Sequence, residues 1–66
     1  MKLIINGKEK EFNSDISLIQ IMKKLKIENQ IGAIAVNMEV LIKDKWDTFT
    51  PKENDKIEFL QFVGGG

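Results

Sequence analysis

The sequence predicts an α+β fold in which a mixed sheet of four to five strands is wrapped on one main helix. Three observations predict it: a strand–turn–strand signal in the first twelve residues, one helix with complete start signals, and three later strand-like segments. Strands segregated around a single helix are typical of α+β proteins. We assign residues 1–63 to one domain, near the lower size limit at which a chain of about 60 residues still folds alone.

The first two strands are predicted from a hairpin signal. Lys2–Asn6 is rich in β-favouring residues and ends in Asn6-Gly7, the strongest short signal for a two-residue hairpin turn. The return strand, Lys8–Phe12, is mostly polar, so we expect it to be exposed or at a sheet edge. A turn follows at residues 13–15.

The helix is predicted from its start. Ser17 is placed as the N-cap residue with Gln20 three positions later, which is the pattern of a capping box. Ile16 and Ile21 flank the cap at the spacing of a hydrophobic staple. The apolar residues at helical spacing, which we expect to be buried, are Leu18, Met22 and Leu25.

The third strand is predicted at Ile31–Asn37, an almost continuous apolar run. Alternation along a strand places Ile34 and Val36 toward the core, and Ala33 and Ala35 on the other face of the sheet. The two internal glycines, Gly7 and Gly32, are expected at turns.

The segment between the third and the last strand is expected to be short and irregular. Val40–Ile42 is predicted as a short strand, and residues 43–48 as a loop or single helical turn around Trp46. Phe49 is expected to anchor this segment to the core. In the turn before the last strand, Asn54 is expected to adopt a positive φ, which Asn tolerates better than most residues.

The last strand, Lys56–Phe62, predicts an exposed apolar patch. Alternation from Ile57 places Ile57 and Phe59 inside the fold and turns Leu60 and Phe62 outward. The patch that we expect as a partner interface consists of Ile4, Ala33, Ala35, Leu60 and Phe62. Alternatively, a bulge near Phe59 and Leu60 reverses the phase and buries some of these side chains.

The composition excludes several classes of function. Ten Lys balance ten Asp and Glu, and this zero net charge argues against a nucleic-acid partner. The chain has no Cys and no His, so the usual nucleophiles, general bases and metal ligands are missing, and we expect no metal site. No apolar run approaches the roughly 20 residues of a membrane span, so we expect no membrane association and a cytoplasmic location.

Three of the five glycines are the last three residues, Gly64-Gly65-Gly66. Glycine has no side chain to bury, so we expect residues 64–66 to be a flexible tail. Such a tail could enter a channel that any side chain would block, and it presents a carboxylate that is ionised at pH 7, given an ordinary pKa of about 3.3–3.7. The alternative is a frayed terminus or a leftover linker.

Several motifs together resemble the thiamine-biosynthesis sulfur carrier family (ThiS-type). They are the run Gly32-Ala33-Ile34-Ala35-Val36-Asn37, the spaced Trp46, the turn Asn54-Asp55-Lys56-Ile57 and the terminal Gly64-Gly65-Gly66. The resemblance covers essentially the whole chain and implies the ubiquitin-like β-grasp fold. The chain departs from the family pattern at Asn54, where Gly is frequent, and at Ile42-Lys43, where Pro-Arg is frequent.

The resemblance implies a carrier that is not an enzyme and binds no cofactor of its own. The Gly66 carboxylate would be adenylated with ATP on an E1-like adenylating enzyme (ThiF-type), with Gly64 and Gly65 threading into that partner. A persulfide enzyme would then supply the sulfur that replaces AMP. The resulting thiocarboxylate would donate its sulfur to thiazole synthase (ThiG-type).

Two other functions remain open from the sequence. One is a sulfur carrier of another pathway, of the molybdopterin type, although that family is usually longer. The other is a non-covalent β-grasp interaction module in which the glycines are incidental. Activation of the terminal carboxylate distinguishes the second from the carriers. A small enzyme is disfavoured, since the chain has no acid–base constellation.

Overall fold

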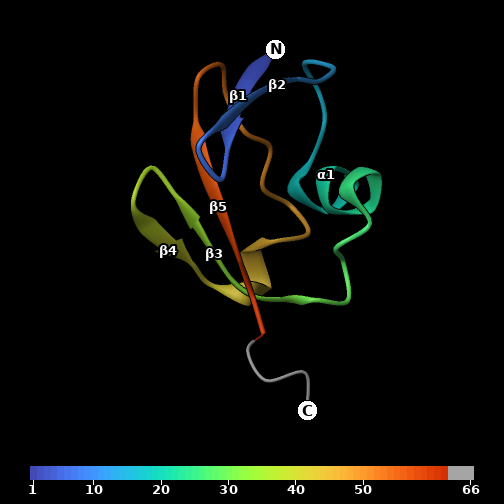
Figure 1. Ribbon diagram of the computed structural model, residues 1–66, viewed down its shortest axis with the longest axis vertical. Coiled ribbons are helices and arrows are strands. Elements are labelled where there is room, and N and C mark those ends of the chain that lie inside the picture. The colour runs from blue at the N-terminus through green and yellow to red at the C-terminus, as the bar shows by residue number, and fades with distance from the viewer. Residues whose placement is uncertain (63–66) are drawn as a thin grey trace.

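The computed structural model describes residues 1–62. In this part of the chain, five strands form one mixed sheet, and a single α-helix packs against it (Figure 1). The elements are β1 (Lys2–Ile5), β2 (Lys8–Glu11), α1 (Leu18–Leu25), β3 (Ile31–Val36), β4 (Glu39–Leu41), a 3₁₀ turn (Lys43–Lys45) and β5 (Lys56–Gln61). The strand order is β2-β1-β5-β3-β4, with β1 and β5 parallel and the other pairs antiparallel. The predicted α+β fold is confirmed.

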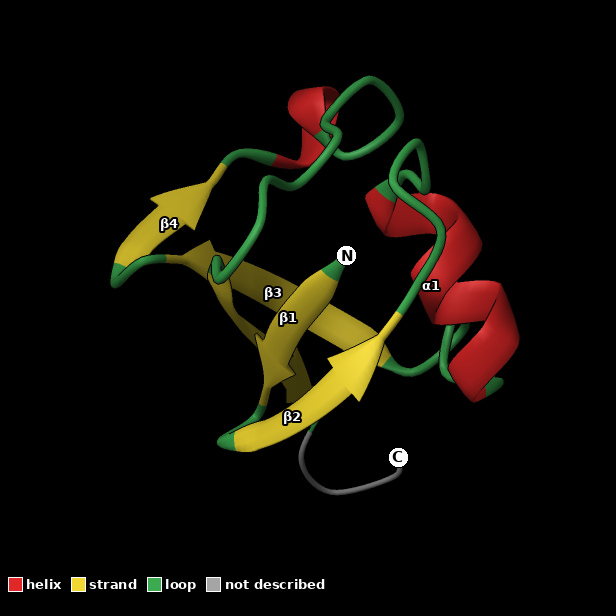
Figure 2. Ribbon diagram, turned by 90° about the horizontal axis from the view of Figure 1, so that it is seen from above, coloured by secondary structure: helices red, strands yellow, loops and turns green. Residues whose placement is uncertain are grey.

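The sheet curls around the side on which α1 lies (Figure 2). The residues of the core come from every layer: Leu3, Ile5, Ile16, Leu18, Ile21, Met22, Ile31, Ile34, Trp46, Ile57 and Phe59. No polar or charged side chain of residues 1–62 is buried, so burial of apolar surface is the main stabilising contribution in this part of the chain.

The β1–β2 hairpin turns at Asn6 and Gly7, as predicted. Their φ angles of 48° and 85° are those of a turn whose central residues are both left-handed, and this turn matches the twist of the flanking strands. The Asn6 side chain has a second role. Its Oδ1 accepts from the Phe59 N–H at 2.8 Å and its Nδ2 donates to the Phe59 carbonyl at 3.4 Å. The amide therefore takes the place of a backbone partner beside β5 where β1 has ended.

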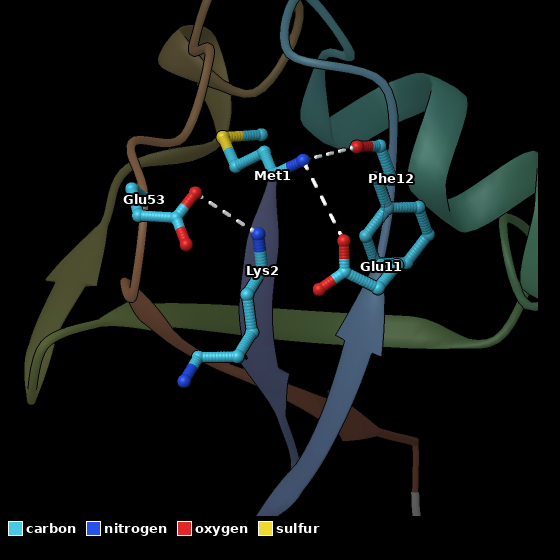
Figure 3. Close-up of polar contacts among 5 residues, drawn as sticks. All are labelled: Met1, Lys2, Glu11, Phe12 and Glu53. Atoms are coloured by element: carbon cyan, nitrogen blue, oxygen red, sulfur yellow. Dashed lines mark hydrogen bonds and ion pairs between the residues drawn. The ribbon is translucent and has the colours of Figure 1, made fainter.

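Polar contacts hold the start of β1 between two other segments (Figure 3). The Met1 amino group donates to the Phe12 carbonyl at 2.7 Å and lies 3.8 Å from a Glu11 carboxylate oxygen. On the other side, the Lys2 N–H donates to Glu53 Oε1 at 3.1 Å. The exposed Glu11 pair adds little stability, but together the contacts join β1 to β2 and to the loop before β5.

Both ends of α1 are capped. The predicted capping box is present: the Gln20 N–H donates to Ser17 Oγ at 3.2 Å, and the Ser17 N–H donates to Gln20 Oε1 at 2.9 Å. At the other end Lys26 adopts a left-handed φ of 59°. Its N–H donates to the Lys23 carbonyl at 3.1 Å and the Ile27 N–H donates to the Met22 carbonyl at 3.0 Å. These two bonds form a Schellman motif, in which glycine is the usual left-handed residue.

We therefore expect Lys26→Gly to raise the free energy of unfolding by about 0.5–1 kcal/mol, because glycine removes the steric cost of a left-handed backbone for an L-residue. Chemical denaturation monitored by circular dichroism measures the change. Lys24→Gly, inside the helix, is the control and is expected to destabilise by about 1 kcal/mol. Loss of stability in Lys26→Gly of the same size as in Lys24→Gly would contradict the cap assignment.

The segment from β3 to β5 differs from the sequence prediction in detail. The chain turns at Asn37 and Met38, with φ angles of 50° and 72°, so β4 begins at Glu39 and ends at Leu41, one residue earlier at its end than predicted. Trp46 is buried and its Nε1–H donates to the Leu41 carbonyl at 2.9 Å. Phe49 does pack against the core, but it is only half-buried. Asn54 has the predicted positive φ, at 70°.

Candidate functional site

The outward side of β5 is apolar near its end, as the alternation predicts. Ile57 and Phe59 are buried, whereas 54% of Leu60 and 69% of Phe62 are exposed. Leu60 lies opposite Ala33 on the neighbouring strand β3, and Glu58 lies opposite Ala35. Leu60 and Ala33 therefore lie side by side on the face of the sheet that α1 does not cover.

A β-bulge is present, but it lies on β3 and not in β5. Ile31 pairs with Gln61 and Ala33 pairs with Leu60, so Gly32 is the extra residue on β3. The bulge changes the phase of β3, because Ile31 and Ile34 are both buried although they are three residues apart. It leaves Leu60 and Phe62 exposed. The prediction of Gly32 at a turn was wrong, since it lies inside a strand.

Ile4 does not belong to a patch with Leu60, which corrects the sequence prediction. Ile4 is half-buried and lies opposite Lys56, because β1 runs parallel to β5 and reaches only its beginning. Leu60 is four residues further along β5, about 13 Å away at 3.3 Å per residue. The exposed, charged Glu58 lies between them along the strand. Alternation gives the face of a residue but not its register against the neighbouring strand.

Sequence reasoning missed two apolar side chains on the same side of the sheet. Val40 lies opposite Ala35 and is 75% exposed, and Ile42, two residues on, is 59% exposed. The sequence holds no signal for their orientation, because Val40, Leu41 and Ile42 are all apolar, and only the structure shows that Val40 and Ile42 are exposed while Leu41 is half-buried. We call Ala33, Ala35, Val40 and Leu60 the outer apolar surface; Ile42 and Phe62 flank it. Exposed apolar side chains that gather in one place are typical of a partner interface.

The chain leaves the sheet beside this surface. The Phe62 N–H donates to the Gln30 carbonyl at 2.9 Å, and Gln61 Nε2 donates to Gln30 Oε1 at 3.0 Å. In Figure 1, β5 points out of the sheet at the end of the molecule where β3 begins. Phe62, Ile31 and Trp46 line an open hollow of about 680 Å³ at this end.

The predicted carrier and threading residues, Gly64, Gly65 and Gly66, lie outside the described residues. Their roles, and the domain boundary at residue 63, stay predictions. Within residues 1–62 no group of three or more His, Cys, Asp or Glu side chains is placed to hold a metal ion. No helix in that range is long and apolar enough to cross a membrane.

Comparison with known proteins agrees with the fold. The model of the ThiS family matches residues 3–66. The chain is 32% identical to the sulfur carrier protein ThiS of Bacillus subtilis over 65 residues, which are 97% of this chain and 98% of that one. The crystal structure of the thiamine biosynthesis protein ThiS from Geobacter metallireducens superimposes with a TM-score of 0.81 and 31% identity, with both chains fully covered.

A longer relative shows a different arrangement. The chain is 30% identical over 66 residues to a thiazole synthase of Paramagnetospirillum magneticum, but it spans only 20% of that protein's length. That single chain therefore contains a segment similar to the 66 residues of this chain together with a much larger remainder.

Proposed function

The chain belongs to the ThiS family, and we propose that it is a sulfur carrier for thiazole formation in thiamine biosynthesis, with the Gly66 carboxylate as the carrier group. The observation that carries the proposal is the family match over residues 3–66, which extends through all three terminal glycines. The Bacillus subtilis relative, named as a sulfur carrier, has almost the same length, so the match concerns the whole carrier.

The proposed chemistry takes place on partner enzymes. On an E1-like adenylating enzyme, a Gly66 carboxylate oxygen attacks the α-phosphorus of ATP, pyrophosphate leaves, and an acyl-adenylate forms. The terminal sulfur of a persulfide then attacks the acyl carbon and AMP leaves. A thiol on the donor attacks the sulfur–sulfur bond, so the donor is left as a disulfide and Gly66 as a thiocarboxylate. Adenylation is needed because a carboxylate is a poor acyl donor until it carries a better leaving group.

Glycine suits this chemistry for steric reasons. Without a Cβ on the terminal residue, the acyl carbon is as open to an attacking sulfur as an amino acid allows. The chain itself carries neither Cys nor His, so the persulfide and the acid–base groups are assigned to the partners. The carrier supplies a carboxylate and a surface by which the partners bind it.

The outer apolar surface supports docking beside the chain end. Leu60 lies two residues before Phe62, and Ala33 and Val40 extend the same face across β3 and β4. Small side chains at Ala33 and Ala35 let a partner approach the backbone closely. A partner that covers this surface is therefore next to the end of β5, from which residues 63–66 continue.

Thiazole synthase is the proposed acceptor of the sulfur. In the Paramagnetospirillum magneticum protein of that name, a segment similar to this chain is part of the same polypeptide. Covalent linkage holds two modules at a high effective concentration, which is useful when one delivers a group to the other. We extend this pairing to the present chain, with thiazole synthase as the enzyme that binds it and takes its sulfur.

The function is tested by removing Gly65 and Gly66. The full chain, incubated with ATP and a ThiF-type activating enzyme, is expected to give AMP-linked protein and, with a persulfide donor, exchange of one terminal oxygen for sulfur by intact mass. The truncated chain is expected to give neither. It should unfold at the same denaturant concentration, because the truncation leaves intact every strand and the helix that the structure describes. Equal adenylation of both chains would show that the terminal carboxylate is not the carrier group.

A further inference from the structure

The presence of glycine at position 32 requires an explanation. It lies inside strand β3, where glycine is unfavourable because it packs nothing and loses more backbone freedom than other residues. Of the two described glycines, only Gly7 has a φ in the left-handed region. The backbone conformation of Gly32 therefore does not require glycine. Some neighbour must therefore account for the missing side chain.

The ring of Phe62 is that neighbour. A Cβ built on Gly32 would lie 3.0 Å from Phe62 Cδ1, 3.0 Å from Cε1 and 3.6 Å from Cζ, and the three nearest atoms are all from this ring. Contacts of 3.0 Å are shorter than ordinary carbon–carbon contacts of about 3.5–4.0 Å, so a side chain at position 32 would push the ring away. Because Gly32 has no side chain, the Phe62 ring packs directly on the backbone of the bulge. We call this contact site on Gly32 the seat.

The seat holds a side chain that is otherwise exposed. Phe62 is 69% exposed, and an aromatic ring so exposed would ordinarily sample several rotamers. Here its backbone is fixed by the bond from its N–H to the Gln30 carbonyl at 2.9 Å, and its ring rests on Gly32. Phe62 thus exposes much of its surface to solvent, while its backbone bond to Gln30 and the contact of its ring with Gly32 fix its position.

We infer that Gly32 is a positioning residue that holds the Phe62 ring ready as the anchor by which the activating enzyme binds the carrier. Large rigid aromatic side chains dominate the binding energy of many interfaces, and fixing them beforehand reduces the entropy lost on association. Phe62 is also the last described residue, two positions before Gly64, so a partner that binds its ring lies close to the three terminal glycines in the sequence. This inference rests on the proposed function, since it concerns the same partner.

The seat itself can be tested on the free protein by NMR. A proton of Gly32 occupies the direction of the missing Cβ, next to the ring, so the two Gly32 α protons should differ strongly in chemical shift through the ring current. In Phe62→Leu the difference should largely disappear. Two Gly32 α protons with the same shifts in both proteins would overturn the seat.

The role of the seat is tested by a double-mutant cycle in the adenylation assay. Gly32→Val and Phe62→Ala are each expected to raise the KM for the carrier on the order of tenfold, with little change in kcat, because each removes the prepared anchor. The double variant Gly32→Val/Phe62→Ala should have about the same KM as either single variant, because both substitutions remove one interaction. Lys10→Val, on the opposite edge strand β2, is the matched control with an unchanged KM.

Thermal unfolding separates positioning from folding. Valine is favoured in strands, so Gly32→Val is expected to unfold at the same temperature as the parent chain or higher, while it binds the enzyme less well. An unchanged KM in Gly32→Val, or effects of the two substitutions that multiply in the double variant, would overturn the role. If the unaltered chain is not adenylated at all, the proposed function fails, and the NMR measurement alone decides on the seat.

Discussion

Phe59→Ala is expected to lower the free energy of unfolding by about 3–5 kcal/mol, and Leu60→Ala, one residue later, by less than about 1 kcal/mol. Phe59 is 4% exposed and its truncation leaves a cavity between the sheet and α1. Leu60 is 54% exposed on the opposite face, so its truncation removes few buried contacts. The two residues have similar hydrophobicity, so their different orientation accounts for most of the expected difference.

Urea denaturation followed by circular dichroism measures both losses. A chain of this size has a small stability, toward the lower part of the usual range of about 5–15 kcal/mol, so Phe59→Ala is expected to be largely unfolded. Phe59→Leu, which retains most of the buried volume, keeps the comparison measurable and should fall between the two alanine variants. Equal losses in Leu60→Ala and Phe59→Ala would mean that Leu60 is part of the core and that the outer apolar surface is wrongly assigned.

The features predicted correctly from the sequence depend on residues close together in the chain. Asn6-Gly7 specifies its own turn, Ser17 and Gln20 cap the helix through bonds three residues apart, and Asn54 carries its own positive φ. The faces of β5 follow from alternation, which is also local. Such local signals predict a sheet of four to five strands with one main helix, and the structure has five strands.

The features missed depend on pairing between distant segments. The bulge at Gly32 exists only relative to β5, and the separation of Ile4 from Leu60 follows from the register of β1 against β5. The left-handed Lys26 was equally hidden, because nothing in its side chain favours that conformation. A sequence pattern gives orientation along one strand, whereas register requires the partner strand.

The candidate site was predicted in part for the same reason. Leu60 and Ala33 were assigned to one face by alternation and are indeed opposite each other. Val40 and Ile42 were missed because a strand of three residues gives too short a pattern to assign a phase. The contact between Gly32 and Phe62 joins residues thirty positions apart, so only the structure could show it.

Gly65→Val is expected to abolish adenylation while leaving the affinity for the activating enzyme nearly unchanged. A β-branched side chain restricts the backbone to fewer conformations and adds width to the part of the chain that must reach ATP. The outer apolar surface and Phe62 are untouched by this substitution, so docking should persist. Binding measured by isothermal calorimetry and adenylation measured by pyrophosphate release report the two steps separately.

The opposite pattern is expected for Phe62→Ala, which makes the pair informative. The Phe62→Ala variant should bind the activating enzyme less tightly. At saturating carrier concentration it should be adenylated at close to the normal rate, because its three glycines still reach the nucleotide. Gly65→Val should fail at any concentration, since occupancy of the enzyme does not restore access to ATP. A Gly65→Val chain adenylated at the normal rate would show that the glycines are not needed for access, and a chain that no longer binds would show that they supply the affinity assigned here to the surface of the sheet.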